Sequence, residues 1–196
     1  MDLSHNRIGN SGARKIAKFL LSTQVLTHLN LADNQILYEG SRYLAQALKV
    51  NKVLKHLSLK LNRLDDKAGS KLCIDLLNNN SNLESLSLSS NSLNHMFCES
   101  LAEFLKINQS IKSLDISCNF IDDSNAATLK DSLVGAPNIT EIDVRNNKLS
   151  ETTEEEINEI ITKNLLRSKG IPYKKLGDYA GGGGDQDAKE SSAAGA

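Results

Sequence analysis

The sequence predicts an α/β solenoid, in which a short strand and a helix alternate along the 196-residue chain. The first observation is a segment that occurs six times, as MDLSHN, LNLADN, LSLKLN, LSLSSN, LDISCN and IDVRNN. The second is its spacing, because the closing asparagines follow one another at intervals of 28, 28, 29, 28 and 28 residues. A fixed period of this length indicates that each unit buries its apolar face against the next unit.

The first half of each unit is predicted to be a short parallel strand. Its apolar residues alternate as LxL, which is the pattern of a strand with one buried face. The residues expected to point into the core are Leu29 and Leu31, Leu57 and Leu59, Leu86 and Leu88, Leu114 and Ile116, and Ile142 and Val144.

The second half of each unit is predicted to be helical, because its apolar residues have the spacing of an amphipathic helix. The clearest stripes are formed by Tyr43, Leu44, Ala47 and Leu48, and by Ile157, Ile160, Ile161 and Leu165. Thr153 and Glu156 predict a capping box at the start of the last helix. Pro137 predicts an early end of the fifth helix, because proline cannot continue a helix.

The closing asparagine of each unit is expected to support the backbone. After the strand the chain turns into the interior, where its N–H and C=O groups need partners. A side-chain amide supplies both a donor and an acceptor, so stacked copies can form a ladder along the solenoid. The predicted ladder consists of Asn6, Asn34, Asn62, Asn91, Asn119 and Asn147.

These residues resemble the leucine-rich repeat family, and the 28-residue period with a helical second half is similar to its ribonuclease-inhibitor-like subclass. The resemblance implies a horseshoe with a parallel β-sheet on its concave face and helices on its convex face. We expect the repeat array over residues 1–165, in about six units of which the first is incomplete. A C-terminal cap or docking segment is expected over 166–179, followed by a disordered tail rich in Gly, Ala and Ser over 180–196.

The first unit lacks the leading part of the motif, although solenoids need terminal caps. We therefore expect the N-terminal edge to be covered by missing repeats or by a partner, and a tolerated open edge is the alternative. The apolar residues expected to lie uncovered at this edge are Met1, Leu3, Ile16, Phe19 and Leu20.

Polar residues that flank the strand leucines are expected to form columns on the concave face. The candidate protein-binding residues there are His28, Asn30, His56, Ser58, Lys60, Ser87, Asp115, Glu141, Asp143 and Arg145. A solvated sheet face is the alternative, because Trp, Tyr and Arg dominate binding hot spots and only Arg145 represents them here.

Other surfaces are also candidates for docking. In the C-terminal segment they are Ile171, Tyr173, Leu176 and Tyr179, and on the helical side they are Lys15, Lys18, Arg42, Lys67 and Lys71. The sequence does not choose among these surfaces.

Composition and motifs argue against several classes of protein. A net charge of −1 and a pI near 6.4 argue against nucleic acid as a partner, and no apolar run is long enough to span a membrane. His28 and His56 stand side by side, but zinc needs three or four ligands, so no metal is expected. No GxSxG, P-loop or HExxH motif occurs, so we expect neither an enzyme nor a cofactor.

Single residues that could carry chemistry have structural explanations. Asp65-Asp66 and Asp122-Asp123 are predicted to cap helices rather than to bind a cation. Cys73, Cys98 and Cys118 form no CxxC pair, which favours a reducing compartment such as the cytoplasm.

The expected function is that of a non-catalytic scaffold for other protein subunits within a large complex. Uninterrupted repeats, the terminal segment IDVRNNKLS and a Glu-rich final helix resemble the leucine-rich repeat subunits of the axonemal nexin–dynein regulatory complex. That resemblance implies a structural subunit of a cytoskeletal complex in the axoneme of a cilium or flagellum, which regulates dynein motility. The alternatives are the ligand-sensing repeat domain of a nucleotide-binding immune receptor and a Ran-type GTPase-activating protein.

Overall fold

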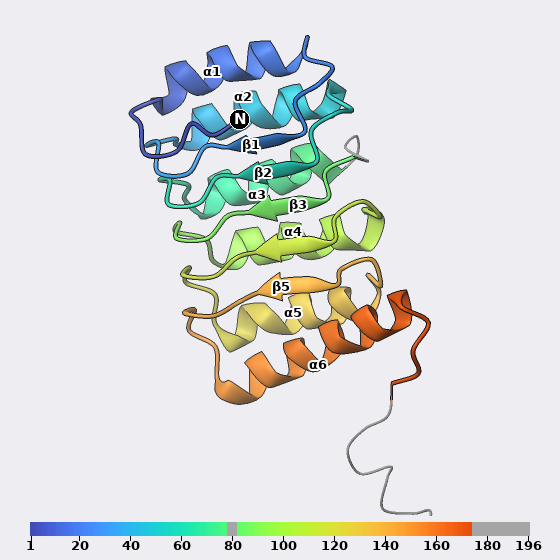
Figure 1. Cartoon of the computed structure of the whole chain (residues 1–196). Helices are drawn as coiled ribbons and strands as arrows, with labels where there is room; N and C mark the ends of the chain where they lie inside the picture. Colours follow the sequence, from blue (N-terminus) through green and yellow to red (C-terminus); the bar gives the residue numbers. More distant parts are fainter. Residues whose placement is uncertain (78–81, 174–196) are drawn as a thin grey trace, which may run out of the picture.

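The computed structural model describes residues 1–77 and 82–173, in which helices and strands alternate (Figure 1). The helices are α1 (Gly9–Leu20), α2 (Tyr38–Val50), α3 (Asp66–Leu77), α4 (His95–Ile107), α5 (Asp123–Val134) and α6 (Glu151–Ser168). The strands are β1 (His28–Asn30), β2 (His56–Ser58), β3 (Ser85–Ser87), β4 (Ser113–Asp115) and β5 (Glu141–Asp143). Within these described residues, no helix is both long and apolar enough to cross a membrane.

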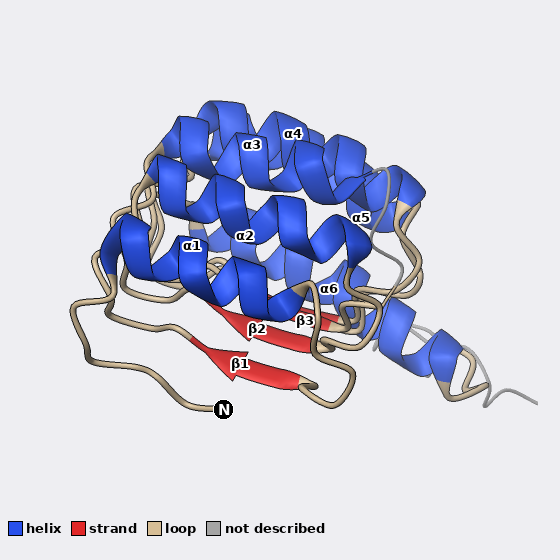
Figure 2. Cartoon of the chain, turned by 90° about the horizontal axis from the view of Figure 1, so that it is seen from above, coloured by secondary structure: helices blue, strands red, loops and turns tan. Residues whose placement is uncertain are grey.

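The strands form one parallel sheet in the order β1-β2-β3-β4-β5. Each strand pairs with the equivalent residues of the next, so that Leu29 stands beside Leu57 and Leu86 beside Leu114. Asp2 adds an isolated bridge to Asn30, which continues the sheet into the first unit. The helices form a layer on one side of the sheet, and the other face of the sheet is open (Figure 2). The predicted α/β solenoid is confirmed.

The core lies between the two layers and follows the predicted strand pattern. Leu31, Leu59, Leu88 and Ile116 are fully buried and form a row along the array. Phe97 and Phe104, both from α4, are the largest of the fully or almost fully buried side chains. Because each repeat packs against its neighbour, this core is continuous from α1 to α6.

A left-handed turn precedes every asparagine of the ladder. The residues before these asparagines have φ between 51° and 58°, and they are His5, Asp33, Leu61, Ser90, Cys118 and Asn146. The conformation points the backbone N–H toward the following repeat. The N–H of Asp33, for example, donates to the carbonyl of Lys60 at 2.9 Å.

The helix ends differ from prediction at one position. α5 ends at Val134, ahead of Pro137, but its 12 residues equal those of α1 and are one fewer than in α2 and α4, so the predicted early end amounts to one residue. The predicted capping box of Thr153 and Glu156 is wrong, because Ser150 is the N-cap of α6 and its hydroxyl accepts from the N–H of Thr153. Glu156 instead forms an ion pair with Lys130 of α5.

The two ends of the array can be compared with the expectations for them. Leu20 is only 1% exposed, so the expectation that it lies uncovered is wrong. Met1 and Phe19 are 46% and 47% exposed, while Leu3 and Ile16 are half-buried. At the other end, α6 continues to Ser168, three residues beyond the expected end of the array at 165.

Candidate protein-binding surfaces

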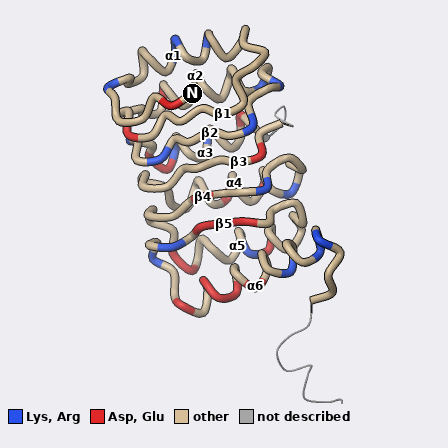
Figure 3. The backbone as a smooth tube through the Cα atoms, viewed as in Figure 1, with Lys and Arg blue, Asp and Glu red and all other residues tan. Residues whose placement is uncertain are grey.

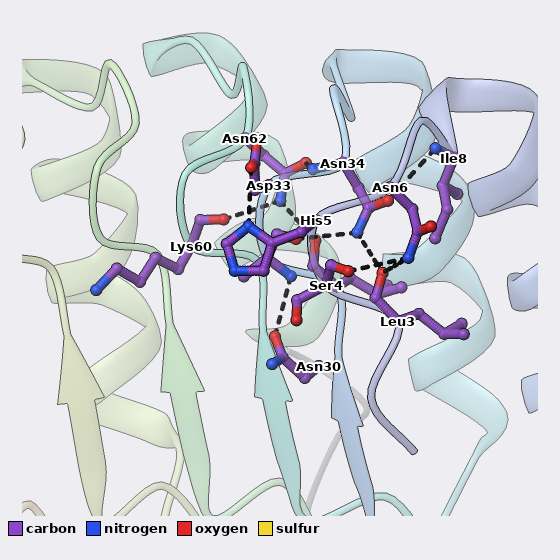
Figure 4. A network of polar contacts seen from close by, with 12 residues as sticks. Leu3, Ser4, His5, Asn6, Ile8, Asn30, Asp33, Asn34, Lys60 and Asn62 are labelled. Carbon is purple, nitrogen blue, oxygen red and sulfur yellow. Dashed lines mark hydrogen bonds and ion pairs between the residues drawn. The ribbon is translucent and has the colours of Figure 1, made fainter.

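The asparagines of the ladder connect the backbone of neighbouring repeats (Figure 4). The Asn62 side-chain oxygen accepts from the N–H groups of Asn34 and Ile36, at 3.1 and 2.9 Å. Its amide nitrogen donates to the carbonyls of Leu31 and Leu59, at 2.9 and 3.0 Å. One side chain therefore satisfies buried groups in its own repeat and in the preceding one.

The same arrangement recurs along the array. Asn34, Asn62, Asn91 and Asn119 are at most 8% exposed, and the amide nitrogen of each donates to a carbonyl of the preceding repeat. Asn6 differs because it is exposed and its printed partners, Leu3 and Ser4, lie in its own unit. The buried asparagines use their polar atoms on the backbone, and these atoms are not offered to a ligand.

A second set of contacts links α1 to α2, α3 to α4 and α5 to α6, through the side chains of Asn10, Asp66 and Asp123. Both carboxylate oxygens of Asp66 accept from backbone N–H groups at the start of α4, including Met96 and Phe97 at 2.9 Å. Asp65 and Asp122 cap their own helices by accepting from the N–H groups three residues later. The capping prediction is confirmed for Asp65 and Asp122, whereas Asp66 and Asp123 accept from groups at the start of the helix of the following repeat.

The concave face brings together the residues predicted to lie there in columns. The rings of His28 and His56 stack with centroids 4.0 Å apart and an interplanar angle of 17°. Burial and the positive charge that His28 can carry lower the pKa of His56. No group of three or more metal-binding side chains occurs in the described residues, so the two rings form a stacked pair on the surface.

Two carboxylates at the acidic end of the concave face are already hydrogen-bonded to other side chains of this face. Arg145 donates two hydrogen bonds to Asp143, at 3.0 and 2.6 Å, and thereby lowers the pKa of that carboxyl. The hydroxyl of Ser87 donates to Asp115 at 2.8 Å. Since Arg145 is already paired within its own repeat, a partner that used it would first have to displace Asp143.

The other concave candidates are small or exposed. Asn30 accepts from the N–H of Ala32, and the Ser58 hydroxyl accepts from the N–H of Lys60. Glu141 and Lys60 are exposed. These residues form a polar part of the concave face.

The candidate C-terminal segment folds back on α6 as far as the structure describes it. The Tyr173 hydroxyl donates to Glu159 at 3.0 Å, and the Lys163 ammonium lies 5.0 Å from the centre of the Tyr173 ring. Ile171 is 49% exposed. Leu176, Tyr179 and the tail over 180–196 lie outside the described residues.

Four exposed apolar side chains, one in each of four consecutive repeats, were not foreseen from the sequence. Leu37, Leu61, Met96 and Phe120 are 45–49% exposed and lie in or beside the connections from strand to helix, which we call the strand-to-helix edge. A signal was present, because equivalent positions carry polar residues in other repeats. Phe120, for example, stands where the neighbouring repeats have Ser92 and Lys148.

Comparisons with known proteins agree with this architecture. Two family models described as leucine-rich repeat match, one at residues 1–17, 24–45, 50–73 and 108–128 and the other at 82–104. No curated protein is similar enough in sequence to count as a relative.

Solved structures with the same fold include the leiomodin-1 actin-binding site 2, with a TM-score of 0.70, 17% identity and coverage of 81% of this chain and 90% of that chain. The tropomodulin C-terminal domain of Caenorhabditis elegans has a TM-score of 0.67 and 18% identity, and covers 80% of this chain and 95% of that chain. At these identities the likeness shows the fold alone.

Proposed function

We propose that this chain, which belongs to the leucine-rich repeat family, is a non-catalytic protein-binding scaffold in a cytoskeletal assembly. The observation that carries the proposal is the strand-to-helix edge, where Leu37, Leu61, Met96 and Phe120 are all exposed. Exposed leucine, methionine and phenylalanine side chains favour contact with another protein over contact with water.

Leu61 supports a role in binding because its position is unfavourable in two respects. It has a φ of 51°, in the left-handed region that bulky residues rarely adopt, and its side chain is 49% exposed. The residues at the equivalent position of the adjacent repeats are Asp33 and Ser90, both of which are polar. A residue that strains the backbone without filling the core fits a role on the outside of the molecule.

Phe120 supplies an aromatic anchor on the same edge. Its ring is 47% exposed, and the Lys148 ammonium lies 5.2 Å from its centre. The asparagine ladder fixes the backbone of the connections that carry these side chains. Binding a partner there would therefore cost little conformational entropy of this chain.

The cytoskeletal part of the proposal has two forms. Similarity of fold to the leiomodin-1 actin-binding site 2 supports actin as the partner. The resemblance of the repeats and of the segment IDVRNNKLS to axonemal dynein-regulatory subunits supports an axonemal partner instead.

Co-sedimentation tests both forms. The chain is mixed with actin filaments or with isolated axonemal doublet microtubules, and we expect saturable pelleting with one of them. The double variant Leu61→Ser and Phe120→Ser should reduce pelleting about tenfold, equivalent to about 1.4 kcal/mol.

Val25→Ser with Val134→Ser is the matched control, because both valines are exposed but lie where helices lead back to strands. If the chain pelleted with neither actin filaments nor doublet microtubules, the cytoskeletal proposal would be rejected. An equal loss for both double variants would reject the strand-to-helix edge as the binding surface.

A further inference from the structure

A basic hollow of about 550 Å³ lies between α1 and α2 on the convex face. Arg14, Lys15 and Lys18 line it from α1, and Tyr43 and Glu39 line it from α2. It lies on the helical side, away from the concave face, and at one end it adjoins the strand-to-helix edge, because the Asn10 side-chain oxygen in its lining accepts from the N–H of Leu37 at 2.9 Å. Figure 3 shows the basic residues of α1, and α1 carries no acidic residue to offset them.

The three cations of α1 stand without ion pairs. All three are exposed, and none of them forms an ion pair with any residue that the structure describes. The acidic residue of the hollow, Glu39, already accepts from Arg42 at 2.8 and 3.2 Å. The hollow therefore has excess positive charge, although the chain as a whole carries a net charge of −1.

An aromatic ring lies beside two basic side chains. The guanidinium carbon of Arg14 lies 5.5 Å from the centre of the Tyr43 ring, and that of Arg42 lies 5.4 Å from it. These contacts hold the arginines beside the ring. Tyrosine and arginine are the residue types that dominate binding hot spots, and they occur together here.

We propose that this hollow binds an acidic segment of a partner protein, an inference that rests on the proposed scaffold function and names the chemistry of a partner. The planar guanidinium of Arg14 can bind a carboxylate with two hydrogen bonds, while Lys15 and Lys18 act as point charges beside it. The half-buried Tyr43 ring holds the Arg14 guanidinium in position for this contact.

A protein segment fits better than the two other polyanions. Nucleic acid binding is typical of extended basic surfaces, whereas these cations are confined to one hollow of the first two repeats. The hollow also combines its cations with Glu39, whose negative charge would oppose an anionic membrane surface.

The test is fluorescence anisotropy with a fluorescein-labelled octapeptide of alternating Asp and Glu. We expect saturable binding to the whole chain, weakened when salt rises from about 50 to about 300 mM. The triple variant Arg14→Gln, Lys15→Gln and Lys18→Gln should bind about tenfold more weakly or worse.

The matched control is Lys55→Gln, Lys106→Gln and Lys112→Gln, which removes the same charge from exposed lysines that are ion-paired. This control should bind within about twofold of the unchanged chain. Thermal unfolding of both triple variants checks that each is folded.

Several outcomes would overturn the inference. They are no binding of the octapeptide, equal losses in the two triple variants, or tighter binding to phosphatidylserine vesicles or to oligo-dT than to the octapeptide. Pelleting with filaments is measured separately, so the hollow can fail while the scaffold function stands, and the reverse.

Discussion

Replacement of Asn119 by alanine tests whether the asparagine ladder holds the repeats together. Asn119 is 5% exposed, and its side-chain oxygen accepts from the N–H groups of Asn91 and Leu93, at 3.2 and 3.1 Å. Its amide nitrogen donates to carbonyls of its own repeat and of the preceding one, including Ile116 and Leu88. Alanine removes all of these bonds while the backbone that needs them stays buried.

The expected loss of stability follows from the groups left without a partner. The carbonyls of Leu88 and Ile116 keep a second amide donor, from Asn91 and Asn147. The N–H groups of Asn91 and Leu93 lose their acceptor, and each unsatisfied buried donor costs about 1–3 kcal/mol. We therefore expect Asn119→Ala to lower the free energy of unfolding by about 2–6 kcal/mol.

Urea unfolding followed by circular dichroism measures this loss, with Asn6→Ala as the matched control. Asn6 is exposed and its amide donates only to Leu3 and Ser4, so water can replace it and the loss should be about 0.5–1 kcal/mol. If the two variants lost equal stability, the cross-repeat hydrogen bonds would not be what stabilises the array.

Three further predictions follow from single positions. Leu61→Asn should raise the free energy of unfolding by about 1 kcal/mol, measured in urea, because asparagine tolerates the left-handed backbone; a loss of stability would show that Leu61 is not strained. Gly69→Ala should lower the free energy of unfolding by about 1–3 kcal/mol, because the new Cβ would overlap buried Leu93 and lie 2.9 Å from Phe97. Its control is Gly135→Ala, whose Cβ would lie 3.5 Å from the nearest atom and which should change the melting temperature little; equal changes in the two variants would contradict this. The pKa of His56 lies below its ordinary value, so as pH falls below about 6.5 the unfolded chain takes up the proton first and the melting temperature should fall. The charge of Glu84 opposes this lowering of the pKa and that of Lys55 adds to it. If the melting temperature of His28→Gln were as pH-dependent as that of the unchanged chain, the role of the His28 charge would be contradicted.

The repeat period is sufficient to predict which residues stand beside one another in the sheet. An interval of 28 residues returns the chain to the same point of the next coil, so Leu29, Leu57 and Leu86 must share one row. The alternation of the strands also predicts the buried side. Both inferences are reliable because they depend on a pattern repeated over the whole array and not on one residue.

Local backbone geometry was harder to predict. The left-handed position before each asparagine is filled by His, Asp, Leu, Ser, Cys or Asn and never by glycine, so composition gave no signal. Ser150 and Thr153 both look like helix caps, and only the position of the chain in space selects Ser150. Asp66 resembles a cap of its own helix, but the helix that it serves is set by the distance between repeats.

The candidate surfaces show the same limit. Spacing places Asp143 and Arg145 on the concave face, but the pairing of the two depends on side-chain conformation. The two leucines, the methionine and the phenylalanine of the strand-to-helix edge would be taken for core residues in a leucine-rich sequence. They are distinguished only by the polar residues at equivalent positions of other repeats.

The stacking of each coil on the next also determines how the molecule would respond to force. A terminal coil can detach without disturbing those beyond its neighbour, so a chain pulled at both ends should lengthen in steps. Each step would release about 28 residues, or roughly 90–100 Å of slack at full extension. The array would thus extend under force by unfolding one repeat at a time.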